Sequence, residues 1–270
     1  MVSSSAAPFA VSSPSPTIAV DVGPSGVVTV WLNRPEQLNA MSVEMVQALL
    51  NVVDGAITAG AIALVIRAKG RGFCAGADLK ERRTMTEGER YAHNRAINAA
   101  VNAVAVAPVP TIAAINGVAM GGGLELALGC DMRFAAESAK IGLTESRIGA
   151  IPGAGGTQRL PRLIGISRAL EMMYSGEPVS ARKAADIGLV NGCVPDENLD
   201  QTVKNYTDLL GARSPTAMRI LKKVVYQGMS VSLADGLECE REALGHILGS
   251  ADYAEGLAAF AEKRAPKFSR

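Results

Sequence analysis

The sequence predicts an α/β core followed by a helical region, and three observations support this prediction. Short β-branched runs alternate with longer helical patterns up to about Thr157, an alternation typical of strands connected by helices. After that point nearly every segment has helical periodicity. The chain has 270 residues, of which 48% are hydrophobic, and this is enough to bury one large core.

The first part of the chain contains most of the predicted strands. Thr17–Val22 and Val27–Asn33 are β-branched runs separated by a Gly-Pro-Ser-Gly turn, which predicts two strands joined by a turn. Ser42 is a suitable N-cap for a helix that reaches about Ala59. We expect further strands at Ala63–Ala68, Thr111–Ile115 and Met132–Ala136, a helix at Glu87–Ala107, and another helix after the glycines at 121–123.

Helices dominate the rest of the chain. We expect them at Ser180–Ile187, Leu199–Ala212, Pro215–Gly228, Leu233–Gly249 and Ala251–Lys263. The first sixteen residues are rich in Ser, Ala and Pro and lack the Lys or Arg of a signal or transit peptide, so we predict a disordered tail. The chain is therefore divided into a disordered tail (1–16), an α/β core with the active site (17–201) and a helical C-terminal region (202–270).

Composition argues against several classes of partner. The net charge is +1, with 27 Lys and Arg against 26 Asp and Glu, so no overall field attracts the chain to nucleic acid or a membrane surface. Aromatic residues make up 4%, too few for platforms that stack single-stranded bases. No apolar run is long enough to span a membrane. The cysteines, Cys74, Cys130, Cys193 and Cys239, lie far apart, which indicates reduced thiols of a cytoplasmic protein rather than a disulfide frame or a metal site.

One carboxylate, Glu125, stands in an otherwise apolar run directly after three glycines. Because helical side chains lean toward the N-terminus, Glu125 should project over Gly121 and Gly122. Glycines let a ligand approach the backbone, and the first amides of a helix have no partner inside it. Such amides suit an oxygen with developing negative charge. The alternative is that Glu125 caps its own helix beside glycines needed for tight packing.

A second carboxylate, Glu145, lies twenty residues later and precedes the glycine-rich segment 153–156. That segment lacks the spacing of a dinucleotide loop and does not directly follow a strand, so we do not expect a nucleotide site. A third glycine-bearing loop, Gly70–Glu81, directly follows a predicted strand, a common ligand position in α/β proteins. His93 and His246 are the only histidines; they show no metal-ligand pattern, and we expect them at the surface or in helix packing.

These segments resemble a known family. Phe73–Lys80, Ala114–Gly123 and Ile151–Arg159 resemble the signature blocks of the enoyl-CoA hydratase/isomerase (crotonase) family. Leu32–Ala40 is similar to its N-terminal block and Ala258–Arg264 to its closing helix. The blocks occur in a consistent order over nearly the whole chain. The resemblance implies a crotonase-type spiral of ββα turns, a C-terminal helical trimerisation region and an acyl-CoA thioester substrate.

The resemblance also implies which residues bind the substrate. In the family two backbone amides hold the thioester oxygen, and by position these belong to Ala77 and Gly122. Coenzyme A is part of the substrate, and neither a separate cofactor nor a metal is implied. The residues implied to contact the CoA thioester are Ala75, Ala77, Asp78, Leu79, Lys80 and Gly122, with Phe260 and Lys263 reaching the CoA moiety, in some members that of a neighbouring subunit. The expected assembly is a homotrimer or homohexamer without nucleic acid or membrane partners.

The glutamates indicate which branch the sequence resembles. Hydratases of the family have glutamates at the positions of Glu125 and Glu145, whereas isomerases often keep one, so the sequence predicts 2-enoyl-CoA hydration. Water needs a base and the α-carbon needs a proton, and two carboxyl groups can share this work. Gly76–Met85 and Glu262–Phe268 resemble the methylglutaconyl-CoA hydratase branch. The alternatives are a double-bond isomerase of the same fold and a non-catalytic RNA-binding or scaffold member.

Overall fold

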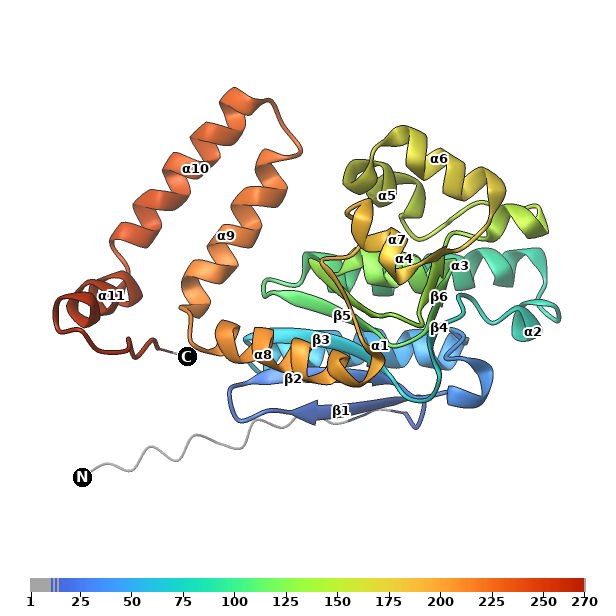
Figure 1. Ribbon diagram of the computed structural model, residues 1–270, viewed down its shortest axis with the longest axis horizontal. Helices are drawn as coiled ribbons and strands as arrows, with labels where there is room; N and C mark the ends of the chain where they lie inside the picture. Colours follow the sequence, from blue (N-terminus) through green and yellow to red (C-terminus); the bar gives the residue numbers. More distant parts are fainter. Residues whose placement is uncertain (1–10, 12, 14, 270) are drawn as a thin grey trace.

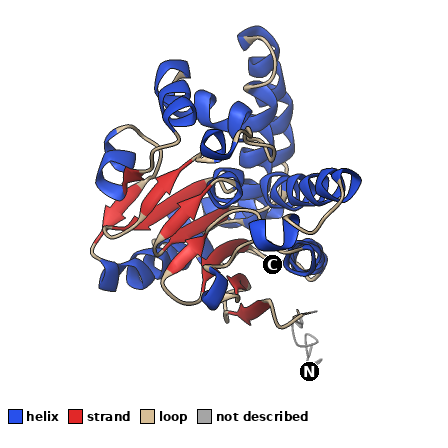
Figure 2. Ribbon diagram, turned by 90° about the vertical axis from the view of Figure 1, so that its right-hand side faces the viewer, coloured by secondary structure: helices blue, strands red, loops and turns tan. Residues whose placement is uncertain are grey.

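The computed structural model describes residues 11, 13 and 15–269, and the strands of this part form two sheets. The larger sheet has six strands in the order β1-β2-β3-β5-β7-β10, and the smaller has four in the order β4-β6-β8-β9. Figure 2 shows the strands in the middle of the molecule with helices around them. The disordered tail expected for residues 1–16 falls mainly outside the described residues.

The larger sheet is parallel apart from its first hairpin. β1 (Ile18–Val22) runs antiparallel to β2 (Val27–Leu32). Its other strands, β3 (Ala63–Ala68), β5 (Thr111–Ile115), β7 (Met132–Ala136) and β10 (Gly192–Val194), pair in parallel. Every residue of β5 is buried, as expected for a parallel strand covered on both faces.

Each of three strands in the smaller sheet directly follows a strand of the larger one. β4 (Gly72–Cys74) follows β3, β6 (Val118–Met120) follows β5, and β8 (Lys140–Gly142) follows β7. These three pair in parallel, and β9 (Val179–Ser180) closes the edge antiparallel to β8. Helices follow β4 and β6, so the chain advances in ββα turns. This confirms the fold that the resemblance implies.

Helices and apolar clusters cover both faces of the larger sheet. Side chains of α1 (Val43–Thr58) and α3 (Glu87–Val106) pack with one set of buried strand residues. On the other face, α8 (Leu199–Gly211) buries Leu199, Val203 and Leu210 against a second set. Figure 1 shows α8 lying along the strands. The parallel strands are thus enclosed between helices.

Shorter helices connect these layers. They are η1 (Pro35–Gln37), α2 (Leu79–Arg82), α4 (Gly122–Gly129), η2 (Glu145–Ile148), α5 (Gly156–Ile164), α6 (Ile166–Ser175), α7 (Ala181–Asp186) and η3 (Asp196–Asn198). α2 and α4 begin shortly after β4 and β6, which are neighbours in the smaller sheet. The loops before both helices therefore meet at the same edge of that sheet.

The last three helices leave the core. Figure 1 shows α9 (Pro215–Gly228) and α10 (Leu233–Leu248) as an antiparallel pair that extends away from the sheets, with α11 (Ala251–Ala261) at its end. No residue of α10 is buried. Because α8 packs on the larger sheet, we propose that the helical C-terminal region begins after α8 rather than at residue 202.

The long elements lie close to their predicted bounds, and two short strands occur after Thr157 that were not predicted individually. These strands, β9 and β10, have two and three residues, which is too short for an alternating pattern to be visible. Among the described residues no helix combines the length and the apolar character needed to cross a bilayer.

Candidate active site

A pocket of about 130 Å³ lies where the loops after β4 and β6 meet the segment that follows β8. Its lining includes Ala75, Gly76, Ala77, Gly121, Gly122, Glu125 and Glu145. All three glycine-bearing loops noted in the sequence contribute residues to it, because Gly153 also lies on its wall. The structure therefore brings the two predicted carboxylates and the two predicted amides to one cavity.

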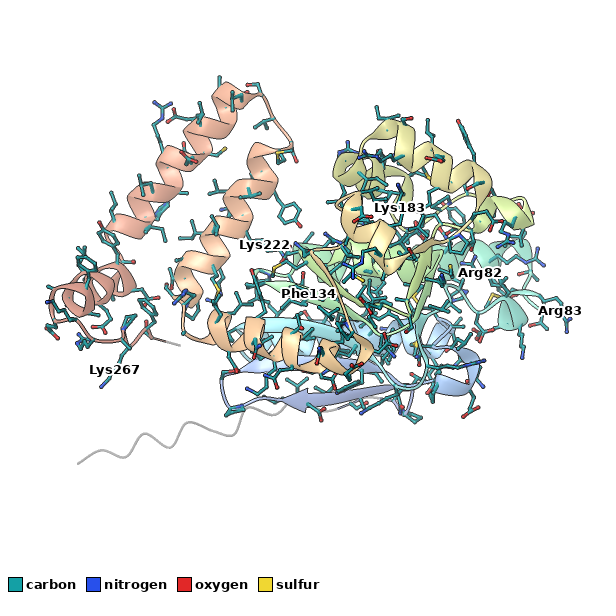
Figure 3. The ribbon with its side chains drawn as sticks, in the orientation of Figure 1. Arg82, Arg83, Phe134, Lys183, Lys222 and Lys267 are labelled. Carbon is teal, nitrogen blue, oxygen red and sulfur yellow. The ribbon has the colours of Figure 1, made fainter. Side chains whose placement is uncertain are left out.

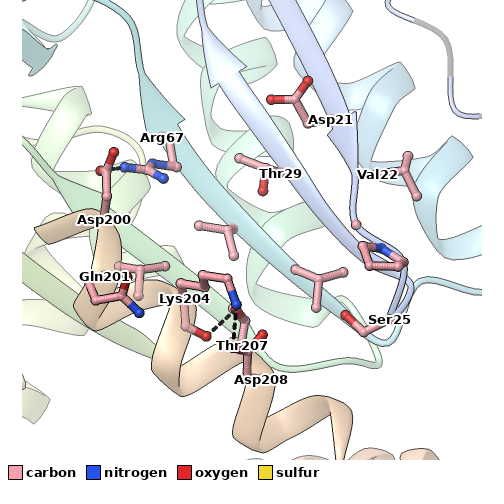
Figure 4. A pocket seen from close by; sticks show the side chains of 15 residues that line it. Asp21, Val22, Ser25, Thr29, Arg67, Asp200, Gln201, Lys204, Thr207 and Asp208 are labelled. Atoms are coloured by element: carbon pink, nitrogen blue, oxygen red, sulfur yellow. Dashed lines mark hydrogen bonds and ion pairs between the residues drawn. The ribbon is translucent and has the colours of Figure 1, made fainter.

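A larger cavity, of about 490 Å³, lies between the first hairpin and α8 (Figure 4). Four of its charged side chains form ion pairs, Arg67 with Asp200 and Lys204 with Asp208. Neither predicted carboxylate lines this cavity. It is larger than the pocket at the loops, but both predicted carboxylates and both predicted amides are in the smaller pocket, which we take as the candidate active site.

Glu125 lies in α4 with only 3% of its surface exposed. Its Oε1 accepts hydrogen bonds from the backbone amides of Ala154 at 2.7 Å and Gly156 at 2.8 Å. Burial raises the pKa of Glu125, and the amide donors counteract part of that rise. The alternative in which Glu125 caps its own helix is wrong, because the carboxylate bonds instead to the loop that leads into α5.

Glu145 is the first residue of η2 and is half-buried. Its Oε2 is buried and has no hydrogen-bond partner among the described residues. Burial raises the pKa of Glu145 to about 7, and the negative charge of Glu125 adds to the rise. One carboxyl group of the pocket is therefore held by two amides, while the other can carry a proton near neutral pH.

Among the described residues, the amides of Ala77 and Gly122 have no hydrogen-bond partner and can bind a ligand. Ala77 forms a parallel bridge with Met41. In it the backbone N–H of Met41 donates to the oxygen of Gly76, and the N–H of Asp78 donates to the oxygen of Met41. The bridge therefore leaves the amide of Ala77 itself unpaired. Gly122 is the first residue of α4, where an amide has no partner inside the helix.

The two amides lie close together because Gly76 has no side chain. A Cβ on Gly76 would come within 3.3 Å of the nitrogen of Gly122 and 3.0 Å of the oxygen of Met120. Gly76 also has a φ of +96°, which disfavours residues with a Cβ. Two adjacent amide donors of this kind can stabilise the negative oxygen of a thioester enolate.

The other predicted CoA-binding residues fall into three groups. Ala75 and Leu79 line the pocket, and Lys80 is exposed beside it. The carboxylate of Asp78 instead accepts hydrogen bonds from Arg34 at 2.9 Å and from the first amides of α2. Burial opposes ionisation of Asp78, but these donors together lower its pKa, which indicates a structural role for its side chain.

Phe260 and Lys263 do not meet the pocket within one chain. Phe260 lies in α11 with 86% of its surface exposed, and Lys263 follows that helix. Neither lines the pocket, and Figure 1 shows α11 at the far end of the molecule from α2 and α3. Their contact with the CoA moiety of a neighbouring subunit stays a prediction.

The structure adds residues to the site that the sequence did not assign. Arg82 of α2 and Asn94 and Ile97 of α3 line the pocket. His93, expected at a surface or in helix packing, is buried in α3 and its Nδ1 accepts a hydrogen bond from Nε of Arg82 at 3.3 Å. The spacing of Asn94 and Ile97, three residues apart on a helix, is the one sequence signal for a shared wall.

Comparison with known proteins identifies the family of the chain. A family model described as enoyl-CoA hydratase/isomerase matches residues 23–270. The chain belongs to the enoyl-CoA hydratase/isomerase family. Acyl-CoA substrates are characteristic of this family, and the crotonase fold described above is its fold.

Similar proteins of the family include both named hydratases and solved structures. The chain is 41% identical to "Probable enoyl-CoA hydratase 2, mitochondrial" of Arabidopsis thaliana, covering 91% of this chain and 82% of that protein. It is also 41% identical to "Methylglutaconyl-CoA hydratase, mitochondrial" of Homo sapiens, covering 90% and 74%. A crystal structure of enoyl-CoA hydratase from Bacillus anthracis superposes with a TM-score of 0.91 at 41% identity, covering 93% and 98% of the two chains.

Proposed function

We propose that this protein is a 2-enoyl-CoA hydratase, which adds water across the double bond of an enoyl-CoA thioester to give a 3-hydroxyacyl-CoA. The observation that supports this proposal is the presence of two carboxyl groups and two unpaired amides in one pocket. The carboxyl groups differ in their hydrogen bonding, so they suit the two different proton transfers that hydration needs.

In the proposed reaction the two amides and the two glutamates have separate roles. The thioester oxygen accepts hydrogen bonds from the amides of Ala77 and Gly122, which stabilise the enolate. Ionised Glu125 takes a proton from water while the water oxygen bonds to the β-carbon. The electron pair of the double bond moves toward the thioester, and protonated Glu145 gives its proton to the α-carbon. A proton must then pass from Glu125 to Glu145 to restore the enzyme.

A double-bond isomerase is the second candidate. It needs one carboxyl group to move a proton between carbons, and the two amide bonds of Glu125 are compatible with a purely structural role for that residue. A relative 40% identical to this chain is named "Enoyl-CoA isomerase/hydratase fer4". Unpaired Glu145 would then act alone.

Incubation with a panel of 2-enoyl-CoA and 3-enoyl-CoA thioesters separates these functions. A hydratase removes the absorbance of the conjugated 2-enoyl group and yields a 3-hydroxyacyl-CoA, identified by mass. An isomerase converts 3-enoyl-CoA to 2-enoyl-CoA without a change in mass, because no water is added. Isomerisation without any hydroxylated product would reject the hydratase proposal.

The finer substrate proposal is a branched, carboxylated thioester such as methylglutaconyl-CoA. The resemblance of Gly76–Met85 to that branch supports it, as does the name of the human relative. The pocket volume of about 130 Å³ is close to the roughly 150 Å³ that holds a benzene molecule in an engineered cavity. A short acyl group is therefore favoured over a long chain.

Self-association into a trimer or a dimer of trimers is also proposed. Large apolar side chains are exposed on the three last helices, among them Leu221, Val225, Leu237, Leu244, Leu248 and Phe260. Exposed apolar surface beyond scattered single residues is typical of interfaces. Analytical ultracentrifugation at micromolar concentration tests this proposal, and a monomer would contradict it. A cytoplasmic location stays our proposal, although several relatives have names that include "mitochondrial"; cell fractionation decides between them.

A further inference from the structure

The wall of the pocket formed by α2 and α3 carries a cation, Arg82, that forms no direct ion pair within the described residues, although the negative charge of Glu125 acts on it from across the pocket. Arg82 lines the pocket together with both glutamates. Its Nε donates to His93, and within the described residues no aspartate or glutamate pairs with its guanidinium. The terminal nitrogens of Arg82 are therefore available to a ligand.

The surroundings hold Arg82 in this position. His93 is 3% exposed, and burial, with the nearby charge of Arg82, lowers its pKa. The imidazole is therefore neutral, and its Nδ1 can accept the hydrogen bond from Arg82. This bond uses one edge of the guanidinium and leaves the terminal nitrogens to form a planar pair, which matches the geometry of a carboxylate.

A hydrocarbon acyl chain would not compensate this charge. Burial already lowers the pKa of Arg82, which shows that the guanidinium is partly removed from water, and arginine stays charged at neutral pH. Filling the pocket with an apolar chain would remove further water from the guanidinium, and the charge of Glu125, which forms no direct ion pair with it, would offset only part of that cost. The amide side chain of Asn94, on the same wall, adds a second polar group.

We propose that Arg82 selects 2-enoyl-CoA substrates whose acyl chain ends in a carboxylate, with Asn94 as a second contact and His93 as the residue that positions the guanidinium. This proposal rests on the proposed binding of an acyl-CoA thioester in this pocket. The substrate is recognised by a salt bridge between Arg82 and the carboxylate at the distal end of the acyl group.

A phosphate of coenzyme A is the competing partner for Arg82. The phosphates are separated from the thioester by the full length of the pantetheine arm, whereas Arg82 lines the same small cavity as Glu125 and Glu145. Pairs of thioesters with and without a carboxylate on the acyl chain distinguish the two partners, because every CoA thioester carries the phosphates.

The first measurement compares binding of glutaryl-CoA and valeryl-CoA, which are saturated and do not react. The wild-type protein should bind glutaryl-CoA more tightly, by about tenfold to hundredfold for a charge-assisted pair. Arg82→Met should remove this preference, and Arg82→Lys should keep part of it because the charge remains without the planar pair. Equal affinity of the wild type for both thioesters would overturn the proposal.

The second measurement compares hydration of glutaconyl-CoA and crotonyl-CoA as a ratio of kcat/KM. Arg82→Met should lower this ratio by about tenfold to hundredfold. Arg83→Met is the matched control, because Arg83 is the exposed neighbour that lies at the outer edge in Figure 3; it should leave the ratio unchanged. If Arg82→Met slows both substrates by the same factor, Arg82 contacts the CoA moiety and the proposal is wrong.

The two measurements distinguish failure of the carboxylate site from failure of the hydratase proposal. If no 2-enoyl-CoA is hydrated but glutaryl-CoA binds preferentially through Arg82, the hydratase proposal is wrong and the carboxylate site stands. If crotonyl-CoA and glutaconyl-CoA are hydrated at equal kcat/KM, the hydratase proposal stands and the carboxylate site is rejected.

Discussion

Glu145 lies directly against Gly121. A Cβ on Gly121 would come within 3.0 Å of Oε1 of Glu145, and Gly121 has a φ of +51°. The glycine thus leaves the space that the carboxylate occupies, in a backbone conformation that residues with a side chain rarely adopt.

Gly121→Ala should therefore lower both stability and activity. We expect the free energy of unfolding to fall by about 1–3 kcal/mol from backbone strain, and turnover to fall as well because Glu145 is displaced. Gly60→Ala is the control, since Gly60 also has a positive φ but nothing lies within 4 Å of its Cβ position. Denaturant unfolding and turnover of both variants measure the two effects; equal turnover in the two variants would contradict displacement of Glu145.

Replacing either pocket glutamate by glutamine should abolish most hydration. Glu125→Gln and Glu145→Gln keep the size of the side chain but remove an acid-base group, which typically contributes about 10²–10⁴-fold. The double variant should lose little more than either single variant, because groups that act as one unit do not contribute independently. If Glu125→Gln hydrates normally while Glu145→Gln is inactive, the isomerase alternative is correct.

Exchange of the α-hydrogen with solvent deuterium separates the two roles. If Glu145 transfers the proton at the α-carbon, exchange in a 3-hydroxyacyl-CoA or saturated thioester should fall more in Glu145→Gln than in Glu125→Gln. Mass spectrometry of the recovered thioester measures this exchange. The opposite order would reverse the assignment of acid and base.

Removal of one amide donor should slow catalysis. Gly122 is the first residue of α4, so Gly122→Pro removes the amide hydrogen without breaking a bond inside the helix, but its Cβ would press on Met41 and we expect the folded state to lose stability as well. We expect a decrease in kcat of about 10²–10³-fold. Gly122→Ala is the control, because its Cβ makes the same close contact, 2.6 Å from Cε of Met41, but keeps the amide. Equal kcat in the two variants would show that Gly122 does not hold the thioester oxygen.

The raised pKa of Glu145 has a defined effect on stability. The folded state holds this proton up to about pH 7, whereas the ordinary value for an exposed glutamate is 4.5. Between these values the folded state binds more protons than the unfolded chain, so the contribution of Glu145 to stability falls as pH rises. Relative to wild type, Glu145→Gln should gain about 1–2 kcal/mol between pH 4.5 and about pH 8, after allowance for partial exposure. A pH-independent difference in urea unfolding would contradict the raised pKa.

The sequence predicted the long elements well and the short ones poorly. β3, β5 and β7 have five or six residues of β-branched or apolar character, and their bounds were predicted. The strands β4, β6 and β8 have three residues each, fewer than an alternating pattern needs. The smaller sheet could therefore be inferred only from the family resemblance.

The site was predictable where the chemistry is local and not where it depends on packing. Glu125 beside three glycines could be interpreted from one segment. The contact between Arg82 and His93 joins α2 to α3, and no pattern within one segment predicts it. The sequence does contain a signal that Asp78 caps a helix rather than binds substrate, because Glu81 follows it by three residues. The structure shows Asp78 capping α2.

The positions of Ala77 and Gly122 in successive turns of the spiral have a consequence for folding. Neither local helix nor local strand brings these amides together; they meet only after β4 and β6 have paired. Contacts between distant segments form after the entropy cost of closing the intervening chain is met. During refolding, far-ultraviolet circular dichroism should therefore recover before affinity for an acyl-CoA does. A bound thioester then stabilises only molecules in which this assembly is complete.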